Sequence, residues 1–209
     1  MSTAEDRAEA LLGPVLAAPR AGRRRLVALA GPPASGKSTV AELLVARLNA
    51  AGCSAAVVPM DGFHLDNRIL ERRDLLARKG CPESFDHGGL LRLVRALSDS
   101  PQVFYPIFDR ARDIAIAGAG EVAADCDTLV VEGNYLLYDA PGWRDLQPCW
   151  DVSIRLDVPE AVLHRRLVDR WLGHGLSPDA ARARAEGNDL RNARLVAAAA
   201  LPADVTLSG

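Results

Sequence analysis

The sequence contains few cysteines and no long hydrophobic run. The four cysteines lie far apart in the sequence, and none of them forms a C-x-x-C pair. This wide spacing excludes a zinc knuckle and a disulfide framework and favours reduced thiols. No stretch approaches the roughly 18 uninterrupted apolar residues that a membrane-spanning helix requires. The apolar stretch at residues 11–18 is broken by Gly13 and Pro14, which is not typical of a signal peptide. We therefore expect a cytoplasmic protein without membrane insertion.

An excess of charge of either sign is also absent. The 25 Lys and Arg residues against 27 Asp and Glu residues leave a net charge of -2, which excludes the basic surface typical of nucleic-acid binding. With 49% hydrophobic residues and no internal repeat, we expect a single domain over residues 1–209. This domain would begin with a helix within residues 1–20 and carry a helical lid at about 160–196. The basic cluster Arg23–Arg25 is predicted to be a solvated lead-in to a strand.

Short apolar runs alternate with segments of helical periodicity. Runs typical of buried parallel strands occupy residues 26–30, 55–60, 128–132 and 152–156, and a last short strand is predicted at 205–207. Helices are predicted at residues 3–18, 38–50, 67–79, 87–98, 159–171 and 178–196. The first should end or kink at Pro14, and the proline-interrupted segment 103–108 should be an edge strand or an excursion. The alternation predicts an α/β fold of the P-loop NTPase type, with a mostly parallel sheet covered by helices on both faces.

A glycine-rich loop lies between the first predicted strand and the next helix. The run Gly31-Pro32-Pro33-Ala34-Ser35-Gly36-Lys37-Ser38 matches the Walker A pattern G-x-x-x-x-G-K-[ST] at every fixed position. Its glycines let backbone N–H groups turn toward an anion, and the following helix directs its positive end at phosphates. We predict that Lys37 binds the β- and γ-phosphates of ATP, that Ser38 binds Mg²⁺, and that Thr39 supports the α-phosphate. The strand and helix around the motif disfavour a chance turn.

Two carboxylates follow or end predicted strands. Asp61 follows the strand at 55–60, and Glu132 ends the strand at 128–132. Ligands bind beyond the carboxyl ends of strands in open α/β sheets, and phosphoryl transfer needs both metal support and a group that receives the acceptor proton. We predict Asp61 as general base, with a helix cap as the alternative, and Glu132 as a support of Mg²⁺ through water, with a salt bridge as the alternative. The glycine after each carboxylate should allow close approach to a ligand.

These motifs together resemble the uridine kinase, phosphoribulokinase and pantothenate kinase superfamily over residues 25–196. The resemblance depends on the segments 31–39, 61–64, 84–87 and 131–134, and on an arginine-bearing helix near residue 165. It implies that Asp61 is the catalytic base beside Lys37 and that the arginine-bearing helix is a lid over ATP. The implied ATP contacts from the lid are Arg165, Arg166 and Arg170, each of which could instead lie on a solvated helix face. The implied acceptor side includes Phe63, His64 and Phe85, although His64 could instead be a satisfied loop histidine.

The segment 105–113 departs from uridine kinases because it lacks their histidine. Its Pro-x-Phe-Asp-Arg pattern, together with the run 186–189 and Asn192, is similar to small kinases described as fructose-transport-system or nucleoside/nucleotide kinases. Asp109 could accept hydrogen bonds from sugar hydroxyls, and Arg110 or Arg112 could hold an acidic group. The alternative for these three residues is a surface ion-pair cluster.

The sequence thus predicts a kinase that transfers the γ-phosphoryl group of MgATP to a hydroxyl of a small metabolite. A fructose-type sugar is favoured by the resemblance, and a pantothenate or uridine kinase-like activity is the alternative acceptor class. A non-catalytic ATP-binding module is the other alternative, whereas a GTPase is disfavoured because no N-K-x-D motif occurs. The sequence leaves open whether the chain forms a homodimer.

Overall fold

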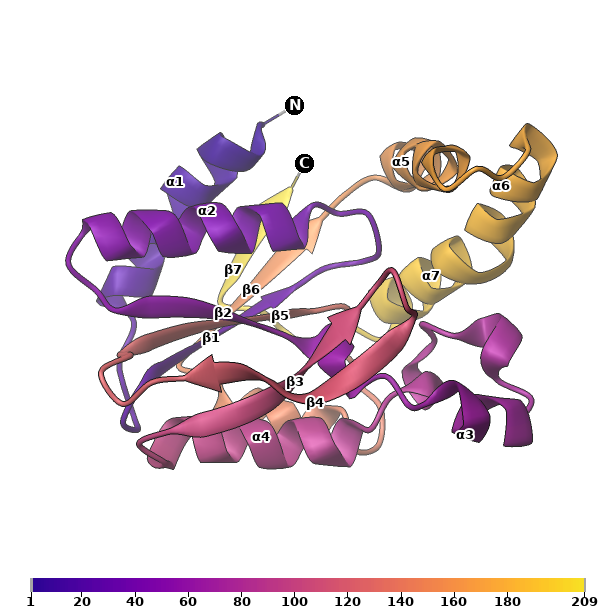
Figure 1. The fold of residues 1–209 in the computed structure, drawn as a ribbon. Helices are drawn as coiled ribbons and strands as arrows, with labels where there is room; N and C mark the ends of the chain where they lie inside the picture. Colours follow the sequence, from indigo (N-terminus) through magenta and orange to yellow (C-terminus); the bar gives the residue numbers. More distant parts are fainter. Residues whose placement is uncertain (1, 209) are drawn as a thin grey trace.

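A five-stranded parallel sheet forms the centre of the computed structural model, which describes residues 2–208 (Figure 1). The strand order is β2-β5-β1-β6-β7, and all four neighbouring pairs are parallel. The strands are β1 (Arg25–Ala30), β2 (Ala55–Pro59), β5 (Thr128–Gly133), β6 (Val152–Asp157) and β7 (Val205–Ser208). The α/β fold and all five of these predicted strands are confirmed.

Different helices cover the two faces of the sheet (Figure 1). On one face lie α1 (Ala4–Ala17) and α2 (Lys37–Ala50), which share a buried core with Val27 and Leu29 of β1. On the other lie α4 (His87–Asp99) and a hairpin of β3 (Val103–Asp109) and β4 (Ile114–Val122), which share a core with Ala28. Because successive residues of a strand point to opposite faces, one apolar run serves both cores.

The segment after β6 forms a helical arm beside the carboxyl ends of the strands (Figure 1). This α5–α7 arm consists of α5 (Glu160–Gly173), α6 (Pro178–Arg184), a π-helical turn (Ala185–Leu190) and α7 (Arg191–Ala198). It has its own small core, in which Leu163 and Leu167 of α5 pack with Leu190 and Ala193. The arm corresponds to the segment expected to be a lid.

Several predicted boundaries were wrong. The helix expected at 67–79 is only α3 (Asn67–Arg72), because Asp74 adopts a left-handed conformation with φ 54 that a helix cannot continue through. The helix predicted at 3–18 is confirmed as α1 (Ala4–Ala17), and of the two outcomes expected at Pro14 an end of the helix is wrong. Strand β4 was not predicted, since its alanines and glycines carry little strand signal, and with β3 it forms an antiparallel hairpin outside the main sheet.

The expectation that Arg23–Arg25 is solvated was wrong for Arg24, which is fully buried. Its guanidinium donates hydrogen bonds to four carbonyl oxygens, those of Leu97, Ser100, Pro101 and Ala123. Two of these belong to the last turn and cap of α4, where exposed carbonyls and the helix dipole favour a cation. The arginine therefore anchors α4 beneath the start of β1.

No helix within residues 2–208 is both long enough and apolar enough to cross a membrane. All four cysteines are free thiols.

Candidate active site

The glycine-rich loop joins β1 to α2, as predicted, and has the backbone of an anion-binding loop. Gly36 and Ala34 both have positive φ, of 87 and 62, so that N–H groups of the loop can point to one concave side. Glycine adopts this conformation freely, whereas Ala34 does so at a cost of about 1 kcal/mol. A Cβ atom at Gly31 would lie 2.7 Å from Ser35 Oγ, so the tight return of the loop requires glycine there.

Two arginines contact carbonyl groups of this loop. Arg166 of α5 donates from Nη1 to the carbonyl oxygens of Ala34 and Ser35, at 3.2 and 3.4 Å. The buried Arg7 of α1 donates from Nη1 to the same Ser35 oxygen at 3.4 Å, and its burial, together with the nearby Arg166 charge, lowers its pKa. These contacts engage carbonyl oxygens of the loop and none of its N–H groups, although the Ser35 N–H is itself bonded to the Pro32 carbonyl oxygen at 3.1 Å. Arg165 and Arg170 lie on the exposed part of α5.

Ser38 and Glu132 meet at the start of α2. Ser38 Oγ donates to Glu132 Oε1 at 3.2 Å, while Glu132 Oε2 is buried without a hydrogen-bond partner. Burial raises the pKa of Glu132, an effect that the positive charge of Lys37 opposes. Within residues 2–208 no three His, Cys, Asp or Glu side chains gather around a metal position. The pair nevertheless fits Mg²⁺, which retains waters and takes one or two protein ligands together with substrate phosphates.

Asp61 lies across from this pair, in a 3₁₀ turn (Met60–Phe63) that follows β2. Register explains the proximity, because Glu132 pairs with Pro59 and with Leu29, so β1, β2 and β5 end at one level. Asp61 Oδ2 accepts a hydrogen bond from Arg110 Nη2 at 2.8 Å. The structure thus brings Asp61, Glu132 and the loop to one edge of the sheet.

The glycines after these carboxylates are required by packing, and their close approach to a ligand stays a prediction. A Cβ atom at Gly62 would lie 1.9 Å from the carbonyl oxygen of Pro106 in β3, and one at Gly133 would lie 2.6 Å from Met60 Cβ. Gly62 therefore lets the turn that carries Asp61 pack directly against the β3 backbone.

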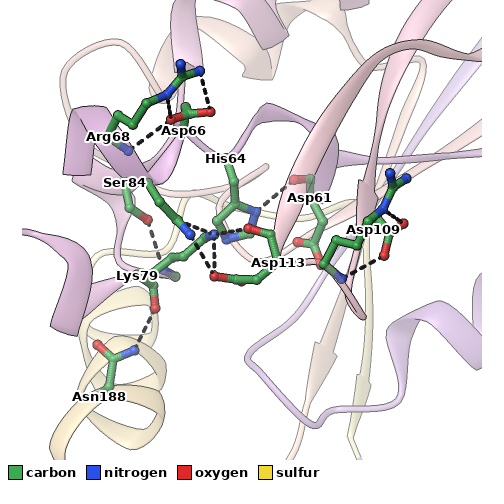
Figure 2. Close-up of polar contacts among 12 residues, drawn as sticks. Asp61, His64, Asp66, Arg68, Lys79, Ser84, Asp109, Asp113 and Asn188 are labelled. Carbon is green, nitrogen blue, oxygen red and sulfur yellow. Dashed lines mark hydrogen bonds and ion pairs between the residues drawn. The ribbon is translucent and has the colours of Figure 1, made fainter. Parts of the chain in front are cut away.

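Aromatic side chains form the wall next to Asp61. The His64 ring lies 4.0 Å from the ring centre of Phe85 and 4.6 Å from that of Phe108, and Phe63 is half-buried nearby in the sequence. Burial lowers the pKa of His64, which favours the neutral ring. Its Nδ1 lies 2.7 Å from the Asp61 carbonyl oxygen, which can only accept, so the proton is on Nδ1 and the lone pair on Nε2 (Figure 2).

The tip of the β3–β4 hairpin contains paired charges (Figure 2). Arg112 donates through its backbone N–H and Nε to Asp109, and these bonds lower the pKa of Asp109. Lys79, which the sequence did not single out, forms an ion pair of 2.9 Å with Asp113 and lies above the Phe108 ring. The side chains of Asp109, Arg110 and Arg112 are therefore at the expected edge, and each is engaged with another charged group.

A cavity of about 410 Å³ opens beside the glycine-rich loop. It lies between the start of that loop, the end of β6 and the α5–α7 arm, and its walls are mainly apolar. The lining includes Gly31, Pro32, Leu156, Val158, Ala193 and Val196. No local motif marks this cavity, because its walls come from segments far apart in the sequence.

Comparisons with known proteins agree with this architecture. A family model described as an AAA domain matches residues 27–174. The crystal structure of a candidate fructose transport system kinase from Silicibacter sp. TM1040 is 60% identical, covers 98% of both chains and has a TM-score of 0.91. A candidate uridine kinase of Schizosaccharomyces pombe (strain 972 / ATCC 24843) is 33% identical, over 88% of this chain and 83% of its own length. A pantothenate kinase of Cutibacterium acnes (strain DSM 16379 / KPA171202) is 36% identical, with 48% of its length covered.

The chain belongs to the AAA-domain family and to the uridine kinase, phosphoribulokinase and pantothenate kinase superfamily of P-loop kinases. The resemblance drawn from the motifs is thereby confirmed. Membership in this superfamily implies nucleotide binding at the P-loop. The roles of individual side chains in this superfamily site, Asp61 and Glu132 included, stay predictions.

Proposed function

We propose that the protein is an ATP-dependent phosphotransferase that transfers the γ-phosphoryl group of MgATP to a hydroxyl of a small, sugar-like metabolite. The observation that carries this proposal is the convergence of the P-loop with Asp61 and Glu132 at the ends of three neighbouring strands, β1, β2 and β5. A nucleotide-binding switch needs only the loop and its metal support. The additional carboxylate beside an aromatic wall is what a phosphoryl acceptor requires.

The nucleotide would lie along the P-loop, with its phosphates held by loop amides and Lys37. The mainly apolar cavity beside the loop is suited to the base, and Ser38 and Glu132 would hold Mg²⁺ directly or through water. Bound Mg²⁺ neutralises charge on the phosphoryl oxygens. Arg166 bridges the arm to the loop, so movement of the arm and closure over the nucleotide would be linked. Arg165 and Arg170 are the exposed arginines of α5, and they would be available to the phosphates.

The acceptor would enter between Asp61, the ring of His64 and the hairpin tip. Asp61 would receive the hydroxyl proton, and the Nε2 lone pair of neutral His64 would accept a hydrogen bond from a second hydroxyl. Asp109 and the arginines beside it add acceptors and donors for further polar groups of a polyol. The 60% identity to a candidate fructose transport system kinase favours a ketose-type sugar among such acceptors.

The proposal is tested by ADP release from MgATP in the presence of single acceptors, with the phosphorylated product identified by mass spectrometry. The panel comprises ketoses, aldoses, sugar alcohols, nucleosides and pantothenate. We expect release that depends on a sugar-like acceptor and is lost in Lys37→Met. Release of equal rate without any acceptor would contradict the proposal. ATP binding without turnover for any acceptor would favour the regulatory module instead.

A further inference from the structure

The run Glu186–Asp189, with Asn192, has no part in the site described so far. Glu186 to Asp189 lie in the π-helical turn between α6 and α7, and Asn192 lies in the first turn of α7. A π turn disrupts the regular hydrogen-bond pattern of an α-helix, and such turns occur frequently at functional sites. The side chains of this turn contact two other segments of the protein.

Asn188 joins the α5–α7 arm to the segment Arg78–Lys79. Its side chain is buried, and its amide accepts a hydrogen bond from Arg78 Nε at 3.0 Å. The same amide donates to the Lys79 carbonyl oxygen at 2.9 Å (Figure 2). Asn192, also buried, accepts from Arg78 Nη2 at 3.4 Å. An amide is the group that can accept and donate here at once, so neither a carboxylate nor an alkyl chain replaces Asn188.

The same turn is fixed to the helix that contacts the P-loop. Asp189 Oδ2 accepts a hydrogen bond from Trp171 Nε1 of α5 at 2.7 Å. Arg166, on the same helix, donates to the P-loop carbonyls. The π turn therefore links α5, and through it the nucleotide side, to Arg78 and Lys79.

Lys79 continues this link to the acceptor side. Its ammonium contacts Asn67 Oδ1, the Asp113 carbonyl oxygen and Asp113 Oδ2, at 2.7, 2.7 and 2.9 Å. These three contacts match its three N–H groups, so Lys79 fixes the hairpin tip rather than offering a free donor to a substrate. Asp113 has φ 56 at this tip, which also carries Arg110, the partner of Asp61.

From this continuous path we propose that Asn188 is a positioning residue that couples the α5–α7 arm to the β3–β4 tip through Lys79. Nucleotide binding under the arm and the arrangement of the acceptor side then change together. The inference rests on the proposed function, because it assumes that the nucleotide and the acceptor occupy these two places. The coupled element is the rigid contact between the turn and Arg78–Lys79.

Hydrogen exchange with a non-hydrolysable nucleotide tests this coupling without an identified acceptor. The probe is the Mg²⁺ complex of adenosine 5′-(β,γ-imido)triphosphate, and exchange is followed in the arm (160–196) and the hairpin tip (107–116). Asn188→Ala removes the direct bond to Lys79 and one bond to Arg78, while the bonds of Asn192 to Arg78 and of Arg184 to Ala77 remain. Asn49→Ala is the control, because the exposed Asn49 amide also both accepts and donates, in its case with the single residue Ala55, and lies at the end of α2 far from the arm in sequence.

In the wild-type protein and in Asn49→Ala, we expect the nucleotide to slow exchange in both regions, by at least about threefold. In Asn188→Ala the arm keeps its response and the tip loses it, which a general loss of stability does not produce. Lys79→Met, which retains the carbonyl bonded to Asn188, should show the same loss and serves if Asn188→Ala does not fold. A tip response that persists in both variants overturns the proposal, as does a wild-type arm response without a tip response. No wild-type response in either region, with no nucleotide binding by calorimetry, overturns the proposed function as well.

Discussion

The ion pair between Asp61 and Arg110 allows the proposed role of Asp61 to be tested by the size of an effect. The Arg110 side chain is 61% exposed, and the two side chains meet at 2.8 Å. A pair exposed in this way contributes about 0.2–1 kcal/mol, which corresponds to at most about fivefold in a rate. A general base contributes about 10²–10⁴-fold. The two roles therefore predict effects that do not overlap.

Asp61→Asn keeps the shape of the side chain and an oxygen for Arg110 but removes the group that receives a proton. We expect kcat to fall by about 10²–10⁴-fold for the acceptor identified in the panel, measured as initial product formation at saturating MgATP. Nucleotide affinity, measured by calorimetry, should change little, because Asp61 follows β2 and is not part of the P-loop.

Arg110→Met provides the control, since it removes the guanidinium and leaves Asp61 in place. The effect of Asp61→Asn is then measured in the wild-type and in the Arg110→Met background. A catalytic base gives a large loss of kcat in both backgrounds. A loss below about fivefold, or one that disappears once Arg110 is replaced, would refute the assignment of Asp61 as base.

Three further predictions concern metal binding, the P-loop and the core. Burial raises the pKa of Glu132, so its carboxyl stays protonated to a higher pH in the folded chain than in the unfolded chain. The contribution of this carboxyl to the free energy of unfolding therefore falls as the pH rises from its unfolded-state pKa through its folded-state pKa. Glu132→Gln should therefore raise the melting temperature more at about pH 8 than at about pH 5, and equal shifts at both pH values would contradict the raised pKa. The same variant should weaken Mg²⁺-dependent nucleotide binding by about 10–100-fold in calorimetry. Arg7→Met should weaken nucleotide binding by about threefold, because its bond to Ser35 is long at 3.4 Å and such bonds contribute about 0.5–1 kcal/mol; unchanged affinity would count against a role in the loop. Arg24→Met should lower the free energy of unfolding in urea by about 3 kcal/mol or more, since four carbonyls lose their donor; a loss below about 1 kcal/mol would show that water replaces the guanidinium.

The nucleotide side could be predicted from the sequence because its chemistry is contiguous in the chain. Residues 31–39 alone specify a strand end, a loop with glycines and a helix start, and all three were found there. Asp61 and Glu132 could be placed at the same edge because parallel strands of a single sheet end on one side. The register that pairs Glu132 with Pro59 then brings them together.

The contacts of Arg7, Arg24, Lys79 and Asn188 could not be predicted, because each joins distant segments. The Asn188 amide meets a carbonyl 109 positions away, and Arg24 binds carbonyls 73 to 99 positions away. A lone arginine or asparagine in a helical or polar segment has the same local pattern whether it is exposed or buried. Strand β4 was missed for a related reason, since its pairing with β3 stabilises a segment whose own residues favour no particular structure.

The charged groups of the acceptor side differ in how readily they can exchange partners. Arg110 and Arg112 are mostly exposed in their pairs with Asp61 and Asp109. Either guanidinium can therefore move into water when a substrate hydroxyl binds to the carboxylate in its place. The Lys79 side chain is only 10% exposed and has all three of its N–H groups engaged, so its release would leave a buried ammonium without acceptors. Acceptor binding should therefore rearrange the partners of Asp61 and Asp109 while Lys79 stays in place. A fixed Lys79 is also what the link through Asn188 requires, because a lysine that exchanged partners with each acceptor would not transmit the position of the α5–α7 arm to the hairpin tip.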